Sequence, residues 1–384
     1  MNDRRVRGRA VSGGGTMREA LFELLAGRIP EETVWTADLS YWIAGQLQLG
    51  EGDPAWNTEE GYLALHQQLG VMPYYWYAKF WLGEPEYGPE IELVADTKAG
   101  RTRRIWRTPI GELVQEEQFL PESCSTGCTK HAVESERDLD ILLYLLEHRR
   151  LRVSAVDDYP QRMELWARYD GLPSIAMPRS PLPAFVYEWA GVQNAFFLLM
   201  DYPDKVETIL TLMEEQEQPV LDAVCQLAPP LVHFADNLSS ESLTTVYDNW
   251  IAGPHRRRLE RLHAAGTKCA VHLDGTVRGL LPKLAAVGFD AVEALTPEPA
   301  GDLPVEEMRA VAGSDTLILW GGVPGVMFAP PYTWADMEAH LERVFDAWEG
   351  TPFILGVADQ VPPDGDIAFC RRIAEFIQQR KYRS

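Results

Sequence analysis

Short apolar runs alternate with longer amphipathic stretches through the second half of the chain, and this alternation predicts βα units. The apolar runs predict strands at residues 231–236, 268–274, 289–294, 316–321 and 353–358. The amphipathic stretches predict helices at residues 241–265, 277–287, 305–312, 334–348 and 367–379. Because helical crossovers connect strands that run in the same direction, we expect an α/β fold with a parallel sheet, closed as a single (β/α)8 TIM barrel.

The first half carries the same pattern in a weaker form, interrupted by insertions. A helical pattern begins at Met17 and ends at Gly27, and an extended apolar segment follows over residues 33–39. Strands are predicted at residues 35–39, 151–156 and 183–188. Residues 1–16 hold arginines and a run of glycines with almost no apolar side chains, which predicts a flexible tail before one barrel domain at residues 17–384.

Two of the insertions have distinctive compositions. Residues 41–81 are crowded with aromatic side chains, which indicates an N-terminal cap over the barrel or an aromatic substrate pocket, and each can hold for different residues. The predicted aromatic substrate contacts are Trp35, Tyr41, Trp42, Tyr75 and Trp76. The second insertion, residues 91–116, alternates charged and β-branched residues and predicts a hairpin that carries Arg101, Arg103, Arg104 and Arg107.

The charge balance narrows the classes of partner. The 384 residues include 35 Lys+Arg and 57 Asp+Glu, and the formal net charge of −22 disfavours nucleic acid and anionic membranes as partners. The longest apolar runs are far shorter than the roughly 20 residues that span a bilayer, and no signal peptide is recognisable. Five scattered cysteines do not indicate a disulfide framework, so we expect a cytoplasmic protein.

Polar side chains gather at the carboxyl ends of the predicted strands, where the catalytic groups of a barrel lie. Since one residue separates His272 from Asp274, both side chains point to the same face of their strand. Together with Glu293 and Asp359 they are predicted to bind a metal ion, because one imidazole with several carboxylates suits Zn²⁺. The alternative for each residue is a buried polar group that is hydrogen-bonded inside the barrel.

Electrostatic repulsion among these groups favours the metal. Several acidic groups at one barrel mouth repel one another unless a cation or bound protons neutralise them. The predicted catalytic residues are Glu293, Asp236 and Asn237. His255 and His263 lie in an arginine-rich helical stretch and are expected to be solvated.

A set of diffuse motifs resembles the uroporphyrinogen decarboxylase-like superfamily, which includes cobalamin-dependent methyltransferases. The motifs are Arg28-Ile29-Pro30 with Val34-Trp35, Thr108-Pro109-Ile110-Gly111 with Glu136-Arg137-Asp138-Leu139, residues 266–275 with their His-x-Asp-Gly turn, Trp320-Gly321-Gly322-Val323, and Phe353-Ile354-Leu355-Gly356. The resemblance covers most of the chain from Met17 onward and implies a (β/α)8 barrel, in agreement with the strand pattern.

The resemblance separates two activities. The decarboxylases carry an arginine-bearing motif after the first strand and a histidine near the last strand, and this chain has neither. Residues 31–78 contain no Lys or Arg, which argues against a polyanionic substrate and for an uncharged aromatic one. The methyltransferase branch binds zinc through a His-x-Cys pair and a later cysteine, and these positions align with His272, Asp274 and Asp359.

The resemblance therefore implies a zinc-dependent methyltransferase of the O-demethylase type. It would move a methyl group from a small methoxylated, aromatic molecule to cobalamin carried by a partner corrinoid protein, because carboxylate ligands leave zinc a stronger Lewis acid for an oxygen ligand. One alternative is a metal-assisted decarboxylase or lyase of a small aromatic acid, with the arginines of residues 101–107 as the carboxylate contact. Another is a barrel that only binds a small ligand. A homodimer is compatible with the sequence.

Overall fold

A computed structural model of the protein describes residues 15–154 and 156–381. The tail predicted for residues 1–16 lies outside the described residues except for Gly15 and Thr16. Thr16 accepts a hydrogen bond from the Glu19 backbone, and the Glu19 side chain accepts one from Thr16, so a capping box begins helix α1 (Met17–Leu25). The predicted helix at this place is confirmed.

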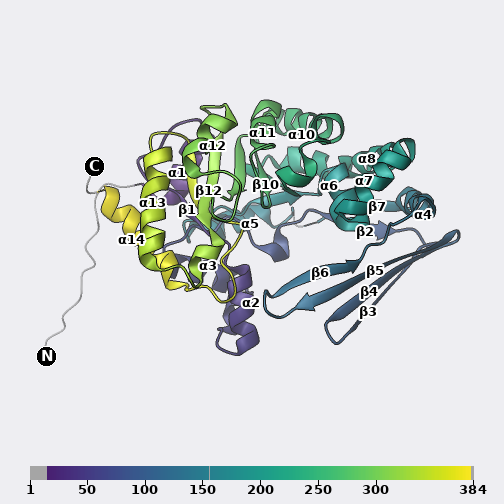
Figure 1. Ribbon diagram of the computed structural model, residues 1–384, viewed down its shortest axis with the longest axis horizontal. Helices are drawn as coiled ribbons and strands as arrows, with labels where there is room; N and C mark the ends of the chain where they lie inside the picture. The colour runs from purple at the N-terminus through teal and green to yellow at the C-terminus, as the bar shows by residue number, and fades with distance from the viewer. Residues whose placement is uncertain (1–14, 155, 382–384) are drawn as a thin grey trace.

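The core of the fold is a curled sheet of seven strands in the order β1-β13-β12-β11-β10-β9-β8, and every neighbouring pair is parallel (Figure 1). The strands are β1 (Trp35–Thr36), β8 (Ile175–Met177), β9 (Leu231–Leu238), β10 (Lys268–Leu273), β11 (Ala291–Leu295), β12 (Ile318–Pro324) and β13 (Phe353–Ala358). All residues of β11 and β12 are buried, as expected where helices and the barrel interior cover both faces. The parallel sheet predicted from the second half is confirmed.

An irregular segment, residues 72–82, joins the two edges of this sheet. On one side the Met72 amide donates to the Trp35 carbonyl over 2.8 Å. On the other side the Ala176 amide donates to the Phe80 carbonyl over 2.8 Å, and Trp81 forms a parallel bridge to Ala176. The segment therefore occupies the eighth position of the barrel without forming a regular strand, and the predicted TIM-barrel fold class holds.

Helices surround the sheet and supply the parallel crossovers (Figure 1). The helices of the second half are α8 (Pro203–Leu227), α9 (Ser240–Leu243), the π-helix η4 (Tyr247–Ile251), α10 (Ala252–Ala264), α11 (Leu281–Val287), α12 (Val305–Ala312), η5 (Gly325–Phe328), α13 (Trp334–Trp348) and α14 (Ala368–Lys381). The bounds of α12 and α13 match the predicted ones at both ends. Each carries one buried apolar stripe, and a capping box at Thr333 and Asp336 begins α13.

The first half adds further helices and a separate antiparallel sheet. The helices are α2 (Ser40–Leu49), η1 (Pro54–Asn57), α3 (Glu59–Leu69), η2 (Tyr77–Lys79), α4 (Glu136–Glu147), α5 (Tyr159–Ala167), α6 (Pro181–Ala184), the π-helix η3 (Phe185–Ala190) and α7 (Val192–Asp201). The sheet comprises β3 (Glu92–Lys98), β4 (Arg101–Thr108), β5 (Gly111–Leu120) and β6 (Ser125–Lys130), and it stands beside the barrel in Figure 1. The predicted hairpin is therefore part of a larger insertion.

Two predictions for the first half are corrected. The strand predicted at residues 183–188 is wrong, because this segment is helical and runs from α6 into η3. It is buried on almost all sides, so its continuous apolar run has no helical period to reveal it. The strand predicted at residues 151–156 exists in part as β7 (Arg149–Val153), but it pairs antiparallel with β2 (Gly83–Tyr87) outside the barrel. No helix of the described residues is both long and apolar enough to cross a membrane.

Candidate active site

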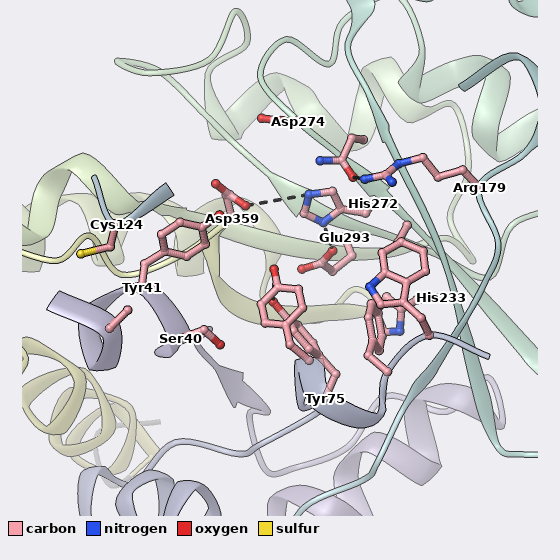
Figure 2. A pocket seen from close by; sticks show the side chains of 16 residues that line it. Ser40, Tyr41, Tyr75, Cys124, Arg179, His233, His272, Asp274, Glu293 and Asp359 are labelled. Carbon is pink, nitrogen blue, oxygen red and sulfur yellow. Dashed lines mark hydrogen bonds and ion pairs between the residues drawn. The ribbon is translucent and has the colours of Figure 1, made fainter. Parts of the chain in front are cut away.

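A cavity of about 520 Å³ opens at the carboxyl ends of the barrel strands (Figure 2). Its volume is in the range of cavities that bind small molecules. Seven of the predicted site residues line it: Tyr41, Tyr75, Asn237, His272, Asp274, Glu293 and Asp359. Further lining residues are Ser40, Ala44, Tyr77, Phe80, Trp81, Cys124, Arg179, His233 and Ala235. The parallel strands thus bring together polar groups that are far apart in the sequence.

At the centre of the cavity His272 lies between two carboxylates. Parallel pairing of β10 with β11 places His272 opposite Glu293, and His272 Nδ1 lies 2.5 Å from Glu293 Oε2. The hydroxyl of Tyr74 donates to the other oxygen of Glu293 over 3.0 Å. The second imidazole nitrogen, Nε2, faces Asp359 Oδ1 at 3.9 Å (Figure 2). Glu293 therefore fixes the imidazole so that Nε2 is directed toward Asp359 and the cavity.

Burial and the excess of carboxylates shift the pKa values of His272, Asp359 and Glu293. Burial by itself lowers the pKa of His272, but the charge and hydrogen bond of Glu293, with Asp359 and Asp274, raise it to about 9. Burial raises the pKa of Asp359 to about 6, against the attraction of His272. Burial also acts to raise the pKa of Glu293, but its contacts with His272 lower it overall. The surrounding carboxylates thus favour a positive charge at the position of His272.

The geometry fits a metal ion in part. Bonds of about 2.0–2.2 Å from nitrogen and oxygen to zinc would let one ion bridge His272 Nε2 and Asp359 Oδ1, which are 3.9 Å apart. Asp274 lines the same cavity, although among the described residues it does not gather with these two donors within 4.8 Å. Glu293 is bonded to Nδ1, the contact that orients histidine ligands in metal sites. Of the four predicted ligands, His272 and Asp359 face one another across 3.9 Å. Glu293 contacts the other nitrogen of His272, and Asp274 lines the cavity.

The predicted aromatic contacts fall into two groups. Tyr41 and Tyr75 line the cavity. Trp35 and Trp42 do not, because their side chains belong to the buried core, with relative exposures of 1% and 8%. Trp76 packs against that core and is also outside the lining. The aromatic insertion thus supplies both core and cavity wall.

Of the predicted catalytic residues at the end of β9, Asn237 lines the cavity and Asp236 does not. Asp236 is fully buried and accepts hydrogen bonds from the Ser180 amide and hydroxyl, each over 2.7 Å. Its other contact is His255 Nε2 at 2.8 Å. The expectation that His255 is solvated is therefore wrong, since its side chain is fully buried as the partner of Asp236. This network ties β9 and α10 to the loop after β8.

Sequence reasoning missed Arg179 and His233. Arg179 follows the end of β8 by two residues, and His233 points into the barrel from the middle of β9. The position of Arg179 after a strand was the available signal, but no strand was predicted at residues 175–177. The arginines of residues 101–107 do not reach this cavity, and three of them pair with glutamates of the inserted sheet.

His233 leads to a prediction about stability. Burial lowers its pKa to about 4, against about 6.5 for an unfolded chain, so the unfolded state binds the proton first as the pH falls. We expect the free energy of unfolding to decrease between pH 6.5 and pH 4, by up to about 3 kcal/mol from this residue. Urea denaturation across this range should show a shallower pH dependence for His233→Gln than for the wild type. Equal slopes in the two proteins would contradict the assignment.

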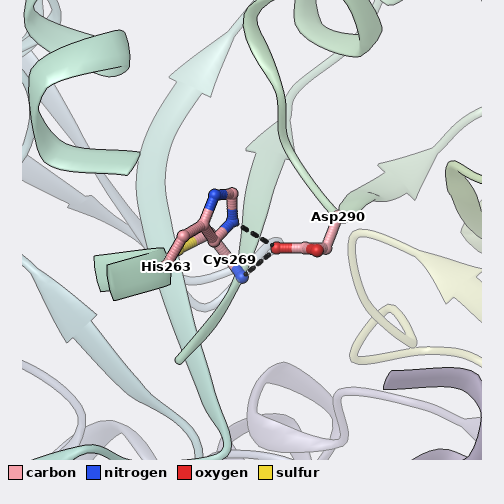
Figure 3. Close-up of side chains that lie close together, drawn as sticks. All are labelled: His263, Cys269 and Asp290. Carbon is pink, nitrogen blue, oxygen red and sulfur yellow. Dashed lines mark hydrogen bonds and ion pairs between the residues drawn. The ribbon is translucent and has the colours of Figure 1, made fainter. Parts of the chain in front are cut away.

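A second group of possible metal ligands lies at the opposite, amino-terminal end of the strands (Figure 3). It consists of His263, Cys269 and Asp290, and their donor atoms lie within 4.8 Å of one another. Asp290 accepts hydrogen bonds from Lys268 Nζ over 2.8 Å and from the Cys269 amide over 2.9 Å, and it lies 2.7 Å from His263 Nε2. The Lys268 ammonium therefore already neutralises this carboxylate, and a metal ion would have to displace it.

Comparison with known proteins agrees with the barrel. A family model described as uroporphyrinogen decarboxylase (URO-D) matches residues 164–380, more than half of the chain and all of β8–β13. No curated protein matches the sequence. Among solved structures, a methyltransferase from Methanosarcina mazei has a TM-score of 0.58 at 13% identity, covering 95% of this chain and 98% of that chain. A B12-independent methionine synthase from Shewanella sp. W3-18-1 has a TM-score of 0.44 at 9% identity, covering 70% and 76%.

Proposed function

The chain belongs to the uroporphyrinogen decarboxylase (URO-D) family, and from this premise we propose that it is a zinc-dependent methyltransferase of the O-demethylase type. The observation that carries the proposal is the placement of His272 in a cavity with aromatic walls. Glu293 is hydrogen-bonded to its Nδ1, and its Nε2 faces Asp359. The methyltransferase of the same overall fold supports it. The methyl donor would be a small methoxylated aromatic molecule, and the acceptor the cobalamin of a corrinoid protein.

In this proposal His272 and Asp359 would hold the zinc ion, and Asp274, which lines the same cavity, would be a further carboxylate ligand. Bound zinc would act as a Lewis acid that withdraws electron density from the ether oxygen. Glu293 keeps the His272 imidazole in the tautomer that presents a lone pair at Nε2, because its carboxylate accepts a hydrogen bond from Nδ1–H. Tyr74 in turn fixes Glu293.

The other lining residues position the substrate. Tyr75, Phe80 and Trp81 offer ring faces and edges against which an aromatic ether can pack while water is excluded. The bond between the methyl carbon and the ether oxygen breaks, and the oxygen keeps the electron pair. The cobalamin of the corrinoid partner would supply the two-electron nucleophile that accepts the methyl group, so the electron pair of the new bond would come from the partner. The phenolate product then takes a proton from solvent.

The direct test is spectroscopic. The purified, zinc-loaded protein is mixed with a reduced corrinoid protein and a panel of methoxylated aromatics, and the Co(I) absorbance is followed. We expect loss of the Co(I) band with at least one member of the panel and formation of the corresponding phenol. No spectral change across the panel would contradict the proposed function.

The position of His272 also supports a second candidate, a decarboxylase of a small aromatic acid, because the imidazole lines the cavity between the carboxylates of Glu293 and Asp359. In that reaction the bond between the ring carbon and the carboxylate breaks, CO₂ leaves, and the ring carbon takes a proton from His272. Product analysis separates the two candidates. Release of CO₂ without any corrinoid would favour the decarboxylase, whereas phenol formation that requires Co(I) would favour the methyltransferase.

The positioning role of Glu293 gives a further prediction. We expect Glu293→Gln to weaken zinc binding by about 10- to 100-fold, because the neutral amide no longer polarises the imidazole. Competition with a chromogenic chelator measures the dissociation constant. Tyr74→Phe is the matched control, since it removes only the hydrogen bond to Glu293 and should have a smaller effect. Unchanged zinc affinity in Glu293→Gln would show that Glu293 does not support a metal ligand.

A further inference from the structure

Arg179 is the one Lys or Arg among the described residues that line the main cavity. Its guanidinium packs over the Trp81 ring at 5.3 Å, and Nη2 donates to Asn237 Oδ1 over 3.3 Å. In Figure 2 Arg179 and Asp359 lie on opposite sides of His272 in the view. A cationic group thus stands in a cavity whose other charged side chains, His272 apart, are carboxylates.

Arg179 also borders a second, smaller cavity of about 220 Å³. The two cavities share Trp81 and Arg179 in their linings, so they adjoin at these residues. The smaller cavity is lined further by Arg149 and Trp189. Arg179 Nε and Trp189 Nε1 are both buried and have no hydrogen-bond partner among the described residues. Buried donors without partners are costly, so this place favours a group that accepts hydrogen bonds.

The charges around the smaller cavity leave a positive surplus. The carboxylate of Glu217 forms an ion pair with the buried guanidinium of Arg258. Glu188 is exposed over 42% of its side chain and accepts a hydrogen bond from Arg179 Nη1 over 3.3 Å, so a ligand carboxylate would share or replace this contact. Arg149 donates twice to the neutral Gln216, over 2.9 and 2.8 Å, and forms no ion pair within the described residues. Arg179 and Arg149 therefore share one carboxylate, that of Glu188, which leaves a surplus of one positive charge in a protein whose net charge is −22.

We propose that the substrate carries a carboxylate, which binds Arg179 where the two cavities meet. This inference rests on the proposed function and narrows its methyl donor to methoxylated aromatic acids. The absence of Lys and Arg from residues 31–78 pointed to an uncharged substrate, but the cation reaches the cavity from the loop after β8 instead. The aromatic ring then occupies the main cavity, with its carboxylate at Arg179 and its ether oxygen toward His272 and Asp359.

The proposed preference for a carboxylate rests on the strength of a charge-assisted hydrogen bond between that group and Arg179 in a partly desolvated cavity. A guanidinium can present two parallel N–H groups to a carboxylate, and such a pair is stronger and more directional than a neutral hydrogen bond. Arg149 adds a second positive charge to the lining of the smaller cavity. An amide of the same shape would keep the ring contacts and lose the charge, so the two ligands isolate the role of Arg179.

The test measures binding by titration calorimetry, without any corrinoid. The ligands are 4-methoxybenzoate and 4-methoxybenzamide, and the proteins are wild type, Arg179→Gln, Arg179→Lys and Arg107→Gln. We expect the wild type to prefer the benzoate by about 10- to 100-fold. Arg179→Gln should lose this preference with little change for the benzamide, and Arg179→Lys should keep part of it. Arg107→Gln, in the inserted sheet, should behave as wild type because Arg107 does not line either cavity and its ion pairs within the described residues are with Glu92 and Glu112.

The outcomes separate this inference from the proposed function. Equal affinity of the wild type for the two ligands, or an unchanged preference in Arg179→Gln, would overturn the inference even if methyl transfer is observed. Failure of both ligands to bind would also overturn it. A carboxylate preference that depends on Arg179, with no Co(I) loss in the corrinoid assay, would sustain the anion site and reject the methyltransferase. Circular dichroism of each variant checks that it is folded, and Arg149→Gln, which leaves Arg179 in place, should weaken benzoate binding to a smaller extent.

Discussion

Replacement of His272 by alanine is expected to remove bound zinc and to lower the rate of methyl transfer by at least about 1,000-fold. His272 is the imidazole directed at Asp359 by Glu293, so its loss leaves facing carboxylates without the nitrogen ligand. Loss of the metal would remove the stabilisation of the leaving oxygen, which contributes several kcal/mol to the reaction. Metal analysis of the purified variant and the corrinoid assay measure the two effects separately.

His263→Ala is the matched control for this experiment. His263 belongs to the other group of possible ligands, with Cys269 and Asp290, at the opposite end of the barrel. We expect this variant to keep both its zinc and its activity. If instead His263→Ala loses the metal and His272→Ala keeps it, the zinc site lies at the amino-terminal end of the strands and the proposed catalytic role of zinc is wrong.

Replacement of Arg258 by methionine is expected to lower the free energy of unfolding by about 3–5 kcal/mol, because it leaves a buried carboxylate without its partner. Arg258 and Glu217 are almost fully buried, with side-chain exposures of 1% and 2%, and Arg258 Nε donates to Glu217 Oε1 over 2.6 Å. Arg258 also donates to the carbonyls of Pro178 and Arg179 and to the Ser180 hydroxyl. Chemical denaturation of the variant and the wild type gives the difference.

A double variant tests the cause. Arg258→Met combined with Glu217→Leu removes both charges, so it should recover a large part of the lost stability. A double variant that is as unstable as the sum of the single ones would indicate that packing around Arg258, not the unpaired carboxylate, determines the loss. The same variants should weaken carboxylate binding, because Arg258 holds the backbone of the loop that carries Arg179.

The regular second half of the fold could be predicted because its local signals agree with its packing. Strands such as β11 are buried throughout, and helices such as α13 bury one stripe between clear end signals. In the first half these signals conflict. The helical segment of residues 181–190 is buried on nearly every side, and the barrel wall at residues 72–82 lacks strand periodicity. Neither segment therefore shows the periodic alternation of apolar and polar residues from which a helix or strand is predicted.

The part of the candidate site that could be predicted consists of residues whose positions depend only on how the parallel strands pair. His272, Glu293 and Asp359 follow from their places on parallel strands, and register then sets which group contacts which. The positions of Asp236 and Arg179 depend on more than register. Asp236 turns to the buried loop at Ser180, and the backbone of Arg179 is held by Arg258, far away in the sequence. Such contacts exist only after the helices have packed.

The pairing of β1 with β13 has a consequence for how the protein folds. Trp35 pairs with Leu355, and the Thr36 hydroxyl donates to the Leu355 carbonyl, 319 residues further along the chain. During synthesis the ring of strands therefore stays open until residues 353–358 have left the ribosome. Contacts of such sequence separation slow folding, and the backbone groups at the edge of β1 that later pair with β13 stay unpaired meanwhile. Chaperone dependence during synthesis should therefore end only after β13 has emerged.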